Sequence, residues 1–455
     1  MTSFFNNRGG IDKGSLYLVV IMAILIFGSY TLVGGTLPTQ FSEANYNPVS
    51  LSMPSNQPAT SSLQMHTFYG VIPTPGLLQP NATACGPAPA NSTKVATASE
   101  LQSALNSKNP DITLTQSITT NNIDIPRTAT GIILRFANDV VVTGNGWPVI
   151  KSTGSGGKLT LIDARVDGMN LTGEGNDLNT NYYLPDFDEL TICRGMSYRS
   201  SRTGYFMINT NKLVVENNFV GWGPRDSYWT NDSKDVLIEN SLIMHIGDDG
   251  FGSHTNPGQE LLRSIIIRNN ILWDALGIKV LGGSKDGTIN GKPGQVLIEN
   301  NKVYIAGFYG LRNGIDPATG EGNTTQRNIS VKNNYVENVR THFPKYPEQI
   351  YGNAYQMFAP GLTMVNVDVS GNIFKRVASA QGKTLAEAYP SYPQPIIDKL
   401  ASINIPDQYK HFPAGVYTLN GFDANHKLQL TSSPWDVQAN NPDAIIQSKN
   451  FIEGF

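Results

Sequence analysis

Three aspartates have the residue type and spacing for acid–base chemistry. Asp248 and Asp249 lie between two glycines in the stretch 247–250, and Asp226 lies 22 residues before Asp248. Carboxyl groups held close together do not all ionise, because like charges raise the pKa of one of them. One group can then donate a proton while an ionised group activates water, as hydrolysis of a glycosidic bond with inversion requires. Asp226, Asp248 and Asp249 are therefore our candidate catalytic residues.

A repeated element must bring these aspartates together, and the chain contains one. Six stretches each join a β-branched run to asparagine: LVVENNFV (213–220), VLIENSLI (236–243), IIIRNNIL (265–272), VLIENNKV (296–303), ISVKNNYV (329–336) and VDVSGNIF (367–374). A period of roughly 20–35 residues with a strand in each unit is typical of a solenoid. The alternating apolar residues predict strands packed on one face, with Val236, Ile266 and Ile298 pointing inward.

The asparagines are expected to mark the corners between strands, because asparagine tolerates left-handed backbone geometry. Asn217 and Asn240 are 23 residues apart, nearly the spacing of the aspartates. One coil corresponds to about 4.8 Å along the axis, so stacked coils would align the asparagine amides and place the three carboxylates on one face. The sequence predicts an all-β fold, a single-stranded right-handed parallel β-helix. A β-sandwich is the alternative.

The ends of this solenoid can also be predicted. Residues 97–107 read as a short amphipathic helix with Ser99 as N-cap and with Leu101, Ala104 and Leu105 on one face. Such a helix suits an N-terminal cap, because the unpaired strand edges there must be covered. We expect the β-helix at 94–376 and a C-terminal cap at 377–455.

The N-terminus predicts a membrane anchor. No charged residue lies between Lys13 and Glu43, and the segment 16–33 is almost wholly apolar. As a helix it reaches about 27 Å, close to the hydrocarbon thickness of roughly 30 Å. We expect a cytoplasmic N-terminus at 1–14 and a single transmembrane helix at 15–34, in contact with the lipid bilayer. A cleaved signal peptide and pilin-like processing are alternatives, and all three place the rest of the chain outside the cytoplasm.

Residues 35–93 are rich in Pro, Ser and Thr and predict an extended stalk. Six N-x-S/T sequons are plausible glycan acceptors in an external protein: Asn81, Asn91, Asn170, Asn231, Asn323 and Asn328. The two cysteines, Cys85 and Cys193, are too few for a disulfide-dense scaffold, and the sequence leaves their pairing open.

The charge composition of the chain limits the kinds of partner that it can bind. Only 15% of residues are charged, below the roughly 25% of typical soluble domains. The net charge is −3 and no lysine or arginine cluster occurs, which argues against a nucleic-acid surface.

Residues 211–314 resemble three successive coils of the polygalacturonase-type glycoside hydrolases, which are right-handed parallel β-helices. The family pattern is Asn-Thr-Asp, Gly-Asp-Asp, Gly-His-Gly and Arg-Ile-Lys. Asp226 stands at the first motif behind Pro224-Arg225, and Gly247-Asp248-Asp249 matches the second. Residues 275–277 lack the third motif's histidine, and the fourth motif is represented by an arginine without its lysine.

The resemblance implies that Asp248 is the general acid, that Asp226 and Asp249 position the water, and that no metal or other cofactor is needed. In the family, the histidine of the third motif and the lysine of the fourth contact an acidic sugar. Both are missing here, so a neutral polysaccharide fits as well as a uronan. Further candidate contacts to a polysaccharide or surface glycan are His254, Lys279 and Arg312, and the nearby aromatic residues Tyr228, Trp229, Trp222, Trp273, Phe308 and Tyr309.

Two other functions suit the same pattern. In a lyase of the pectate lyase type, the three aspartates would bind Ca²⁺ through oxygen, and Arg312 or Lys279 would abstract the proton. In a non-catalytic glycan-binding module, at a cell surface, on an envelope or as a virion spike, the aspartates would be a solvated turn. Calcium dependence with unsaturated products indicates the first, and binding without cleavage indicates the second.

Overall fold

The computed structural model describes residues 91–169, 178–316, 319–341, 352–358, 361, 363–391, 393–403, 405–410, 427–437 and 450–455. The expected anchor at 15–34 and nearly all of the expected stalk lie outside these ranges. Within them, no helix has both the length and the apolar character needed to cross a membrane.

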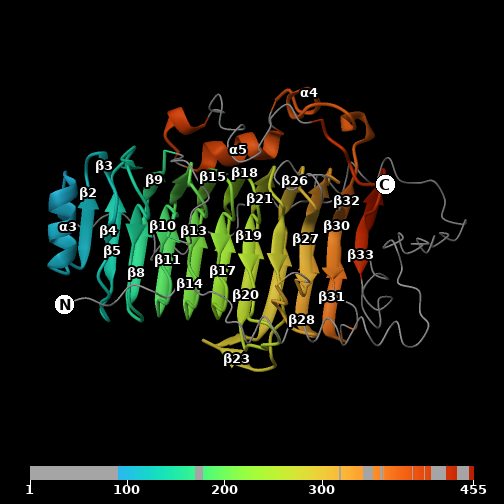
Figure 1. Ribbon diagram of the computed structural model, residues 1–455, viewed down its shortest axis with the longest axis horizontal. Coiled ribbons are helices and arrows are strands. Elements are labelled where there is room, and N and C mark those ends of the chain that lie inside the picture. The colour runs from blue at the N-terminus through green and yellow to red at the C-terminus, as the bar shows by residue number, and fades with distance from the viewer. Residues whose placement is uncertain are drawn as a thin grey trace, which may run out of the picture. The chain divides into compact units, whose positions relative to one another are not determined.

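The strands of successive coils stack into three sheets, here termed sheets A, B and C, of 11, 11 and 10 strands (Figure 1). Within each coil the chain passes from sheet A to B to C, and the strands of each sheet pair in parallel. The described residues therefore form a predominantly β structure with the architecture of a parallel β-helix. The expected right hand of the coil stays a prediction.

Sheet A consists of β1 (Thr93–Val95), β2 (Asp111–Leu114), β5 (Ile132–Phe136), β8 (Lys158–Ile162), β11 (Glu189–Cys193), β14 (Lys212–Glu216), β17 (Asp235–Glu239), β20 (Ser264–Arg268), β25 (Gln295–Glu299), β28 (Thr325–Lys332) and β31 (Thr363–Ser370). Sheet B consists of β3 (Ile118–Thr120), β6 (Val142–Gly144), β9 (Arg165–Asp167), β12 (Met196–Tyr198), β15 (Phe219–Gly223), β18 (Leu242–Ile246), β21 (Ile271–Trp273), β26 (Lys302–Tyr304), β29 (Tyr335–Glu337), β32 (Ile373–Lys375) and β34 (Phe451–Glu453). Sheet C consists of β4 (Ile123–Asp124), β7 (Ile150–Lys151), β10 (Tyr182–Tyr183), β13 (Tyr205–Phe206), β16 (Tyr228–Trp229), β19 (Phe251–Ser253), β22 (Ile278–Val280), β27 (Tyr309–Gly314), β30 (Asn353–Phe358) and β33 (Trp435–Val437).

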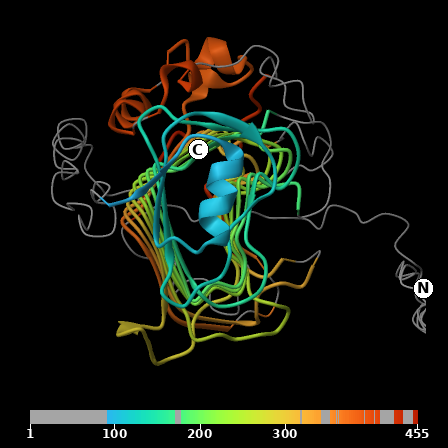
Figure 2. The same ribbon diagram turned by 90° about the vertical axis from the view of Figure 1, so that its left-hand side faces the viewer.

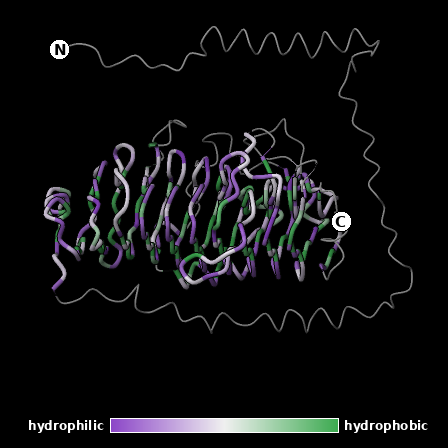
Figure 3. The backbone as a smooth tube through the Cα atoms, turned by 90° about the horizontal axis from the view of Figure 1, so that it is seen from below, coloured by the Kyte–Doolittle hydropathy of each residue, from purple (hydrophilic) through white to green (hydrophobic). Residues whose placement is uncertain are grey.

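Each of the six repeated stretches forms a sheet A strand followed by a sheet B strand, as the pattern predicts. Hydrophobic and hydrophilic stretches alternate around the coils (Figure 3). Val236 and Ile298 lie in the buried core, but the prediction for Ile266 was wrong. The ladder partner of Val236 is Ile265, so Ile266 is displaced by one residue and points to the outer face.

The corner role of asparagine is confirmed. Asn217, Asn240, Asn269, Asn300 and Asn333 all have φ between 54° and 57°. The second asparagine of each pair, rather than the first, builds the ladder inside the coil. The Nδ2 of Asn270 donates to Oδ1 of Asn301 at 3.0 Å, and the same bond recurs from Asn301 to Asn334 and onward to Asn372 and Asn450.

The predicted N-terminal helix forms as α3 (Ala98–Asn106), which lies across the end of the coil in Figure 2. Leu101, Ala104 and Leu105 are buried as expected. The expectation of Ser99 as N-cap was wrong. Thr97 is the N-cap, because its side chain accepts from the backbone of Glu100 while the Glu100 carboxylate accepts from the backbone of Thr97.

The segment after Val377 lies mainly along the side of the coil. It contains η1 (Ala378–Ala380), α4 (Leu385–Ala388), α5 (Gln394–Ser402) and η2 (Asp407–Tyr409) (Figure 1). Ile396 and Leu400 of α5 are buried in one cluster with Leu242 and Trp273 from the outer face of sheet B. The last strands, β33 and β34, extend sheets C and B. A hairpin of β23 (Thr288–Ile289) and β24 (Lys292–Pro293) projects from the other side of the coil.

Candidate active site

The three aspartates lie where the chain turns from sheet B into sheet C on two neighbouring coils. Asp226 precedes β16, and Asp248 and Asp249 precede β19. The amide of Ser227 donates to the carbonyl of Asp249 at 2.9 Å, which fixes the register of the two turns. Carboxylate oxygens of the three residues all lie within 4.8 Å of one another. The coil register thus brings the candidate residues together, as the spacing predicts.

Burial and mutual repulsion favour the protonated forms. Burial, with the charges of Asp248 and Asp249, raises the pKa of Asp226 well above its usual range. Burial raises the pKa of Asp249 to about 6, while Lys279 opposes this shift and Asp248 adds to it. The two groups interact strongly, so their protons belong to the cluster as a whole. Raised pKa values in such a cluster favour one protonated carboxyl group beside ionised ones, the combination that acid–base catalysis needs.

Asp248 is the most accessible of the three and pairs with a cation from the neighbouring coil. Its side chain is 15% exposed, and Nη1 of Arg225 lies 3.2 Å from its Oδ2. Its Oδ1 accepts a hydrogen bond from the backbone amide of Asp249 at 3.2 Å. In the polygalacturonase-type pattern, a threonine occupies the position of Arg225 in this chain. That pattern therefore does not predict the ion pair between Arg225 and Asp248.

Asp249 is supported on both carboxylate oxygens. The Tyr309 hydroxyl donates a hydrogen bond to Oδ1, and the Lys279 ammonium lies 3.4 Å from Oδ2. Burial and the charge of Asp249 raise the pKa of Tyr309 well above its usual range, so the hydroxyl remains a donor. Burial alone would lower the pKa of Lys279, but the charges of Asp249 and Asp316 outweigh it and the pKa is raised.

Lys279 and Arg312 lie side by side on adjacent strands of sheet C, in direct register. Both contact Asp316, at 3.2 Å from Lys279 and 3.9 Å from Arg312. The guanidinium of Arg312 also lies over the Tyr309 ring, 5.2 Å from its centre. Two cations thus lie beside the aspartates, and their charges are partly balanced by Asp316.

Gly252 leaves space beside the carboxylates. It pairs with Trp229 on one side and Lys279 on the other along the outer face of sheet C. A Cβ placed at Gly252 would lie 2.9 Å from Oδ1 of Asp226 and 3.6 Å from Oδ2 of Asp249. Glycine at this position therefore keeps open the space next to both oxygens.

His254 follows β19 and is 6% exposed. Its Nδ1 lies 2.9 Å from Oε2 of Glu321, and its Nε2 lies 4.0 Å from Oδ2 of Asp249. Burial and the charge of Lys279 lower the pKa of His254 to about 4, so the ring is neutral near pH 7. His254, Lys279 and Arg312 thus lie near the three aspartates, and their role as substrate contacts stays a prediction.

The aromatic candidates divide into two groups. The Tyr228 ring is buried inside the coil, stacked between Tyr205 at 5.2 Å and Phe251 at 5.1 Å, so it belongs to the core and not to a sugar-binding surface. Trp229 lies on the outer face beside Gly252, half-buried, with the Arg202 guanidinium 5.9 Å from its ring centre.

Of the remaining aromatics, Trp222 and Trp273 pack beneath the C-terminal segment on the outer face of sheet B, away from sheet C. Phe308 is buried and directly precedes Tyr309, whose hydroxyl contacts Asp249. Tyr309 is itself buried, so only Trp229 among the aromatic candidates is partly exposed on the outer face of sheet C.

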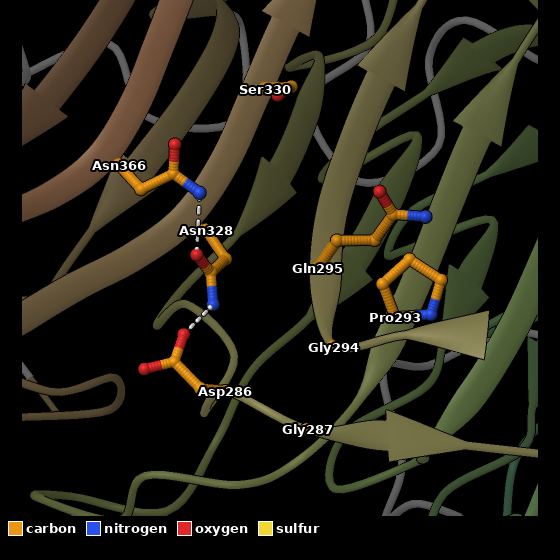
Figure 4. A pocket seen from close by; sticks show the side chains of 8 residues that line it. All are labelled: Asp286, Gly287, Pro293, Gly294, Gln295, Asn328, Ser330 and Asn366. Carbon is orange, nitrogen blue, oxygen red and sulfur yellow. Dashed lines mark hydrogen bonds between the residues drawn. The ribbon is translucent and has the colours of Figure 1, made fainter.

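The sequon asparagines within the described residues differ in exposure. Asn91 is exposed and Asn231 half-buried, whereas Asn323 is buried and donates from Nδ2 to a backbone carbonyl at 3.3 Å. Asn328 lines a separate surface pocket of about 300 Å³ beside the β23–β24 hairpin (Figure 4), where its Nδ2 donates to Asp286 at 2.8 Å. Asn81 and Asn170 lie outside the described residues.

Cys193, at the end of β11, is buried and disulfide-bonded. The chain's other cysteine, Cys85, lies outside the described residues. Such a bond is typical of proteins that fold in an oxidising compartment.

Sequence reasoning missed four participants: Arg225, Gly252, Asp316 and Glu321. Arg225 lies 23 residues before Asp248, one local coil length, so the register could have indicated the pair. Asp316 and Glu321 come from the connection after β27, which has no repeat, and no sequence signal assigns them to the site.

Comparison of the chain with protein-family models and with curated proteins finds no match. The site must therefore be interpreted from its own geometry.

Proposed function

We propose that this protein is a glycoside hydrolase of the pectin-lyase-like, right-handed parallel β-helix class, with a three-aspartate site that cleaves a polysaccharide or surface glycan. One observation carries the proposal. Two buried carboxyl groups with raised pKa values, Asp226 and Asp249, lie within 4.8 Å of a third, Asp248, beside a glycine that leaves space for a reactant. Acid and base are thus available at one point, as glycosidic cleavage requires.

The roles of the three carboxyl groups follow from their surroundings. Asp249, with Tyr309 and Lys279 on its two oxygens, is ionised above about pH 6 and acts as the base for water. The resemblance assigns the acid to Asp248. The electrostatics of the free protein favour a proton on Asp226, because burial and two neighbouring charges raise its pKa. The donor is therefore the Asp226–Asp248 pair, in which the proton rests on Asp226.

The stereochemical outcome is a separate question. Acid and base lie roughly 6.5–9.5 Å apart in most inverting glycosidases and about 5–5.5 Å apart in retaining ones. The oxygens here lie within 4.8 Å, closer to the retaining geometry. Inversion, which the sequence analysis expects from the three carboxyl groups, therefore stays a prediction, and NMR of the first-formed anomer distinguishes it from retention.

The charges near the site suit either a uronan or a neutral glucan. Lys279 and Arg312 offer positive charge to a carboxylated sugar, but Asp316 partly neutralises both. Trp229, half-buried on the outer face of sheet C, is available for apolar contact with a sugar face, whereas Tyr309 is buried.

A Ca²⁺-dependent polysaccharide lyase is the second candidate, because three carboxylate oxygens within 4.8 Å could bind a hard cation. Lys279, 3.4 Å from Asp249, would then lie close to the bound Ca²⁺. Repulsion between the lysine charge and the metal disfavours this arrangement. A non-catalytic glycan-binding protein is the third possibility.

The test uses the full chain with uronans and neutral glucans in oxygen-18-labelled water, with and without calcium. A hydrolase incorporates one labelled oxygen per cleavage at the new reducing end. Unsaturated products that appear only with calcium indicate the lyase, and intact, bound glycan indicates the non-catalytic module.

We propose further that the protein is single-pass, with the β-helix outside the cytoplasm at a cell surface, envelope or virion. The apolar segment 16–33 and the disulfide at Cys193 support this location. Retention in the membrane fraction after carbonate washing tests it, and release with a new N-terminus near Gly35 contradicts it.

A further inference from the structure

The connection between β27 and β28 turns back toward the aspartates. The amide of Asp316 donates to the carbonyl of Glu321 at 2.9 Å, and the amide of Gly322 donates to the carbonyl of Thr255 at 2.9 Å. Two carboxylates lie in this connection, whose described residues include 315, 316 and 319–322. Asp316 lies against Lys279, and Glu321 lies against His254.

Glu321 determines which nitrogen of His254 carries the proton. The hydrogen bond from His254 lowers the pKa of Glu321, so its carboxylate is ionised and can only accept. The Nδ1 of His254, 2.9 Å from Oε2, must therefore carry the hydrogen. Thr319 also donates to Oε2 at 3.0 Å and holds the carboxylate in place. The Nε2 then presents a lone pair.

That lone pair is directed into the site. The backbone amide of His254 donates to Oδ1 of Asn231 at 3.0 Å, which fixes the residue from behind. The Nε2 is buried and has no hydrogen-bond partner among the residues that the structure describes. Asp249, Lys279, Asp316 and Glu321 are the charged groups that face the ring.

The gap between His254 and Asp249 matches one water molecule. Their facing atoms, Nε2 and Oδ2, are 4.0 Å apart, too far for a direct hydrogen bond. A water about 2.8 Å from both could donate one hydrogen to each. The space that Gly252 leaves open adjoins the same Oδ2 of Asp249, 3.6 Å from the position of an added Cβ.

We propose that His254 is a catalytic residue which accepts a hydrogen bond from the attacking water while Asp249 takes a proton from it, and that Glu321 is the residue that positions His254. The inference rests on the proposed hydrolase function. In the reaction the water oxygen bonds to the anomeric carbon and one of its protons passes to Asp249. The glycosidic C–O bond breaks, and the leaving oxygen takes the proton of the Asp226–Asp248 pair. The second water hydrogen, held by His254, stays on the product hydroxyl.

The first arm of the test measures the tautomer and needs no substrate. Nitrogen-15 NMR of the full chain, labelled at its six histidines and assigned with His254→Gln, should show His254 protonated on Nδ1. In Glu321→Gln the neutral amide can either accept from or donate to Nδ1, so the preference for the Nδ1–H form should weaken. An Nε2–H ring in the wild type overturns the inference.

The second arm measures turnover on the substrate found above. Glu321→Gln should lower kcat about tenfold to a hundredfold with little change in KM, as expected for a residue that orients a histidine, and Glu321→Asp should recover part of the loss. Glu260→Gln is the matched control, because Glu260 pairs with Arg327 and its side chain is 29% exposed against 26% for Glu321. Its kcat should be unchanged. An active enzyme whose kcat is unaffected by His254→Gln and Glu321→Gln overturns this inference alone, whereas no cleavage of any glycan overturns the proposed function with it.

Discussion

The hydroxyl of Tyr309 donates a hydrogen bond to Oδ1 of Asp249 from a strand two coils further along sheet C. This bond stabilises the ionised carboxylate and lowers the pKa of Asp249, against the larger effect of burial that raises it. A core strand of the solenoid therefore helps to set the protonation of the proposed base.

The pH dependence of activity tests this relationship. Asp249 must be ionised to act as base, so kcat/KM should fall as the pH drops below about 6. In Tyr309→Phe the carboxylate loses a donor, its pKa rises, and this acid limb should move to higher pH by less than about one unit. An acid limb that stays in place or moves to lower pH contradicts the assignment of Asp249 as base.

The ionisable carboxyl group of Asp226 should lower the free energy of unfolding near neutral pH. Its pKa is raised in the folded state, so the folded protein binds more protons than the unfolded chain above the ordinary aspartate pKa. Stability from this group is then present at low pH and is lost as the pH rises. Asp226→Asn should raise Tm at pH 7 by roughly 1–4 °C while abolishing activity, and the gain should shrink toward pH 4.

Asp407→Asn is the control for this measurement, because the Asp407 side chain is 91% exposed. Its Tm should stay close to that of the wild type. If Asp226→Asn lowers Tm at pH 7, the carboxylate is stabilised by its surroundings and the electrostatic account fails.

The proton donor can be identified with activated substrates. Loss of the acid should lower kcat on the natural glycan by about 10²–10⁴-fold, but far less on an aryl glycoside whose leaving group needs no proton. We expect this rescue for Asp226→Asn and Asp248→Asn, which share the donor, and not for Asp249→Asn. Equal losses on both substrates in all three variants would exclude the assigned roles.

Gly252 should be required for turnover more than for folding. The added methyl group in Gly252→Ala meets the Asp226 carboxylate at 2.9 Å and fills the space beside Asp249. We expect a kcat reduced by at least about tenfold, with a Tm close to that of the wild type. The matched control is Gly221→Ala on sheet B, where the new methyl also meets a side chain at 2.9 Å, that of Phe219. Unchanged activity in Gly252→Ala would show that this space is not used.

The fold could be predicted largely from local rules. The β-branched runs joined to asparagine recur in six stretches, so each of these coils gives independent support for the same pairing. Ile266 differs from the prediction because Ile265, not Ile266, is the ladder partner of Val236, and a one-residue offset places a strand side chain on the opposite face. The corner geometry of Asn217 and Asn300 followed from the residue type alone.

The site could be predicted only as far as the register reaches. Asp226 and Asp249 are one coil apart, so counting residues was sufficient. The contacts of Glu321 and Asp316 depend on a connection without a repeat, which bends back in a way that no local pattern encodes. Asp235 shows the same limit. It is buried and paired with Lys292 of the projecting hairpin at 2.7 Å, a contact that no repeat in the sequence indicates.

The most direct test of the central claim is the release of new reducing ends from a glycan panel by wild-type protein and by Asp226→Asn, Asp249→Asn and Asp407→Asn, assayed in parallel at pH 7. The account predicts cleavage by the wild type and by Asp407→Asn, and losses of orders of magnitude in the two site variants without loss of the folded state. If the wild type binds glycans but releases no reducing ends from any of them, or if the two site variants cleave as fast as the wild type, the three aspartates do not form a hydrolytic site.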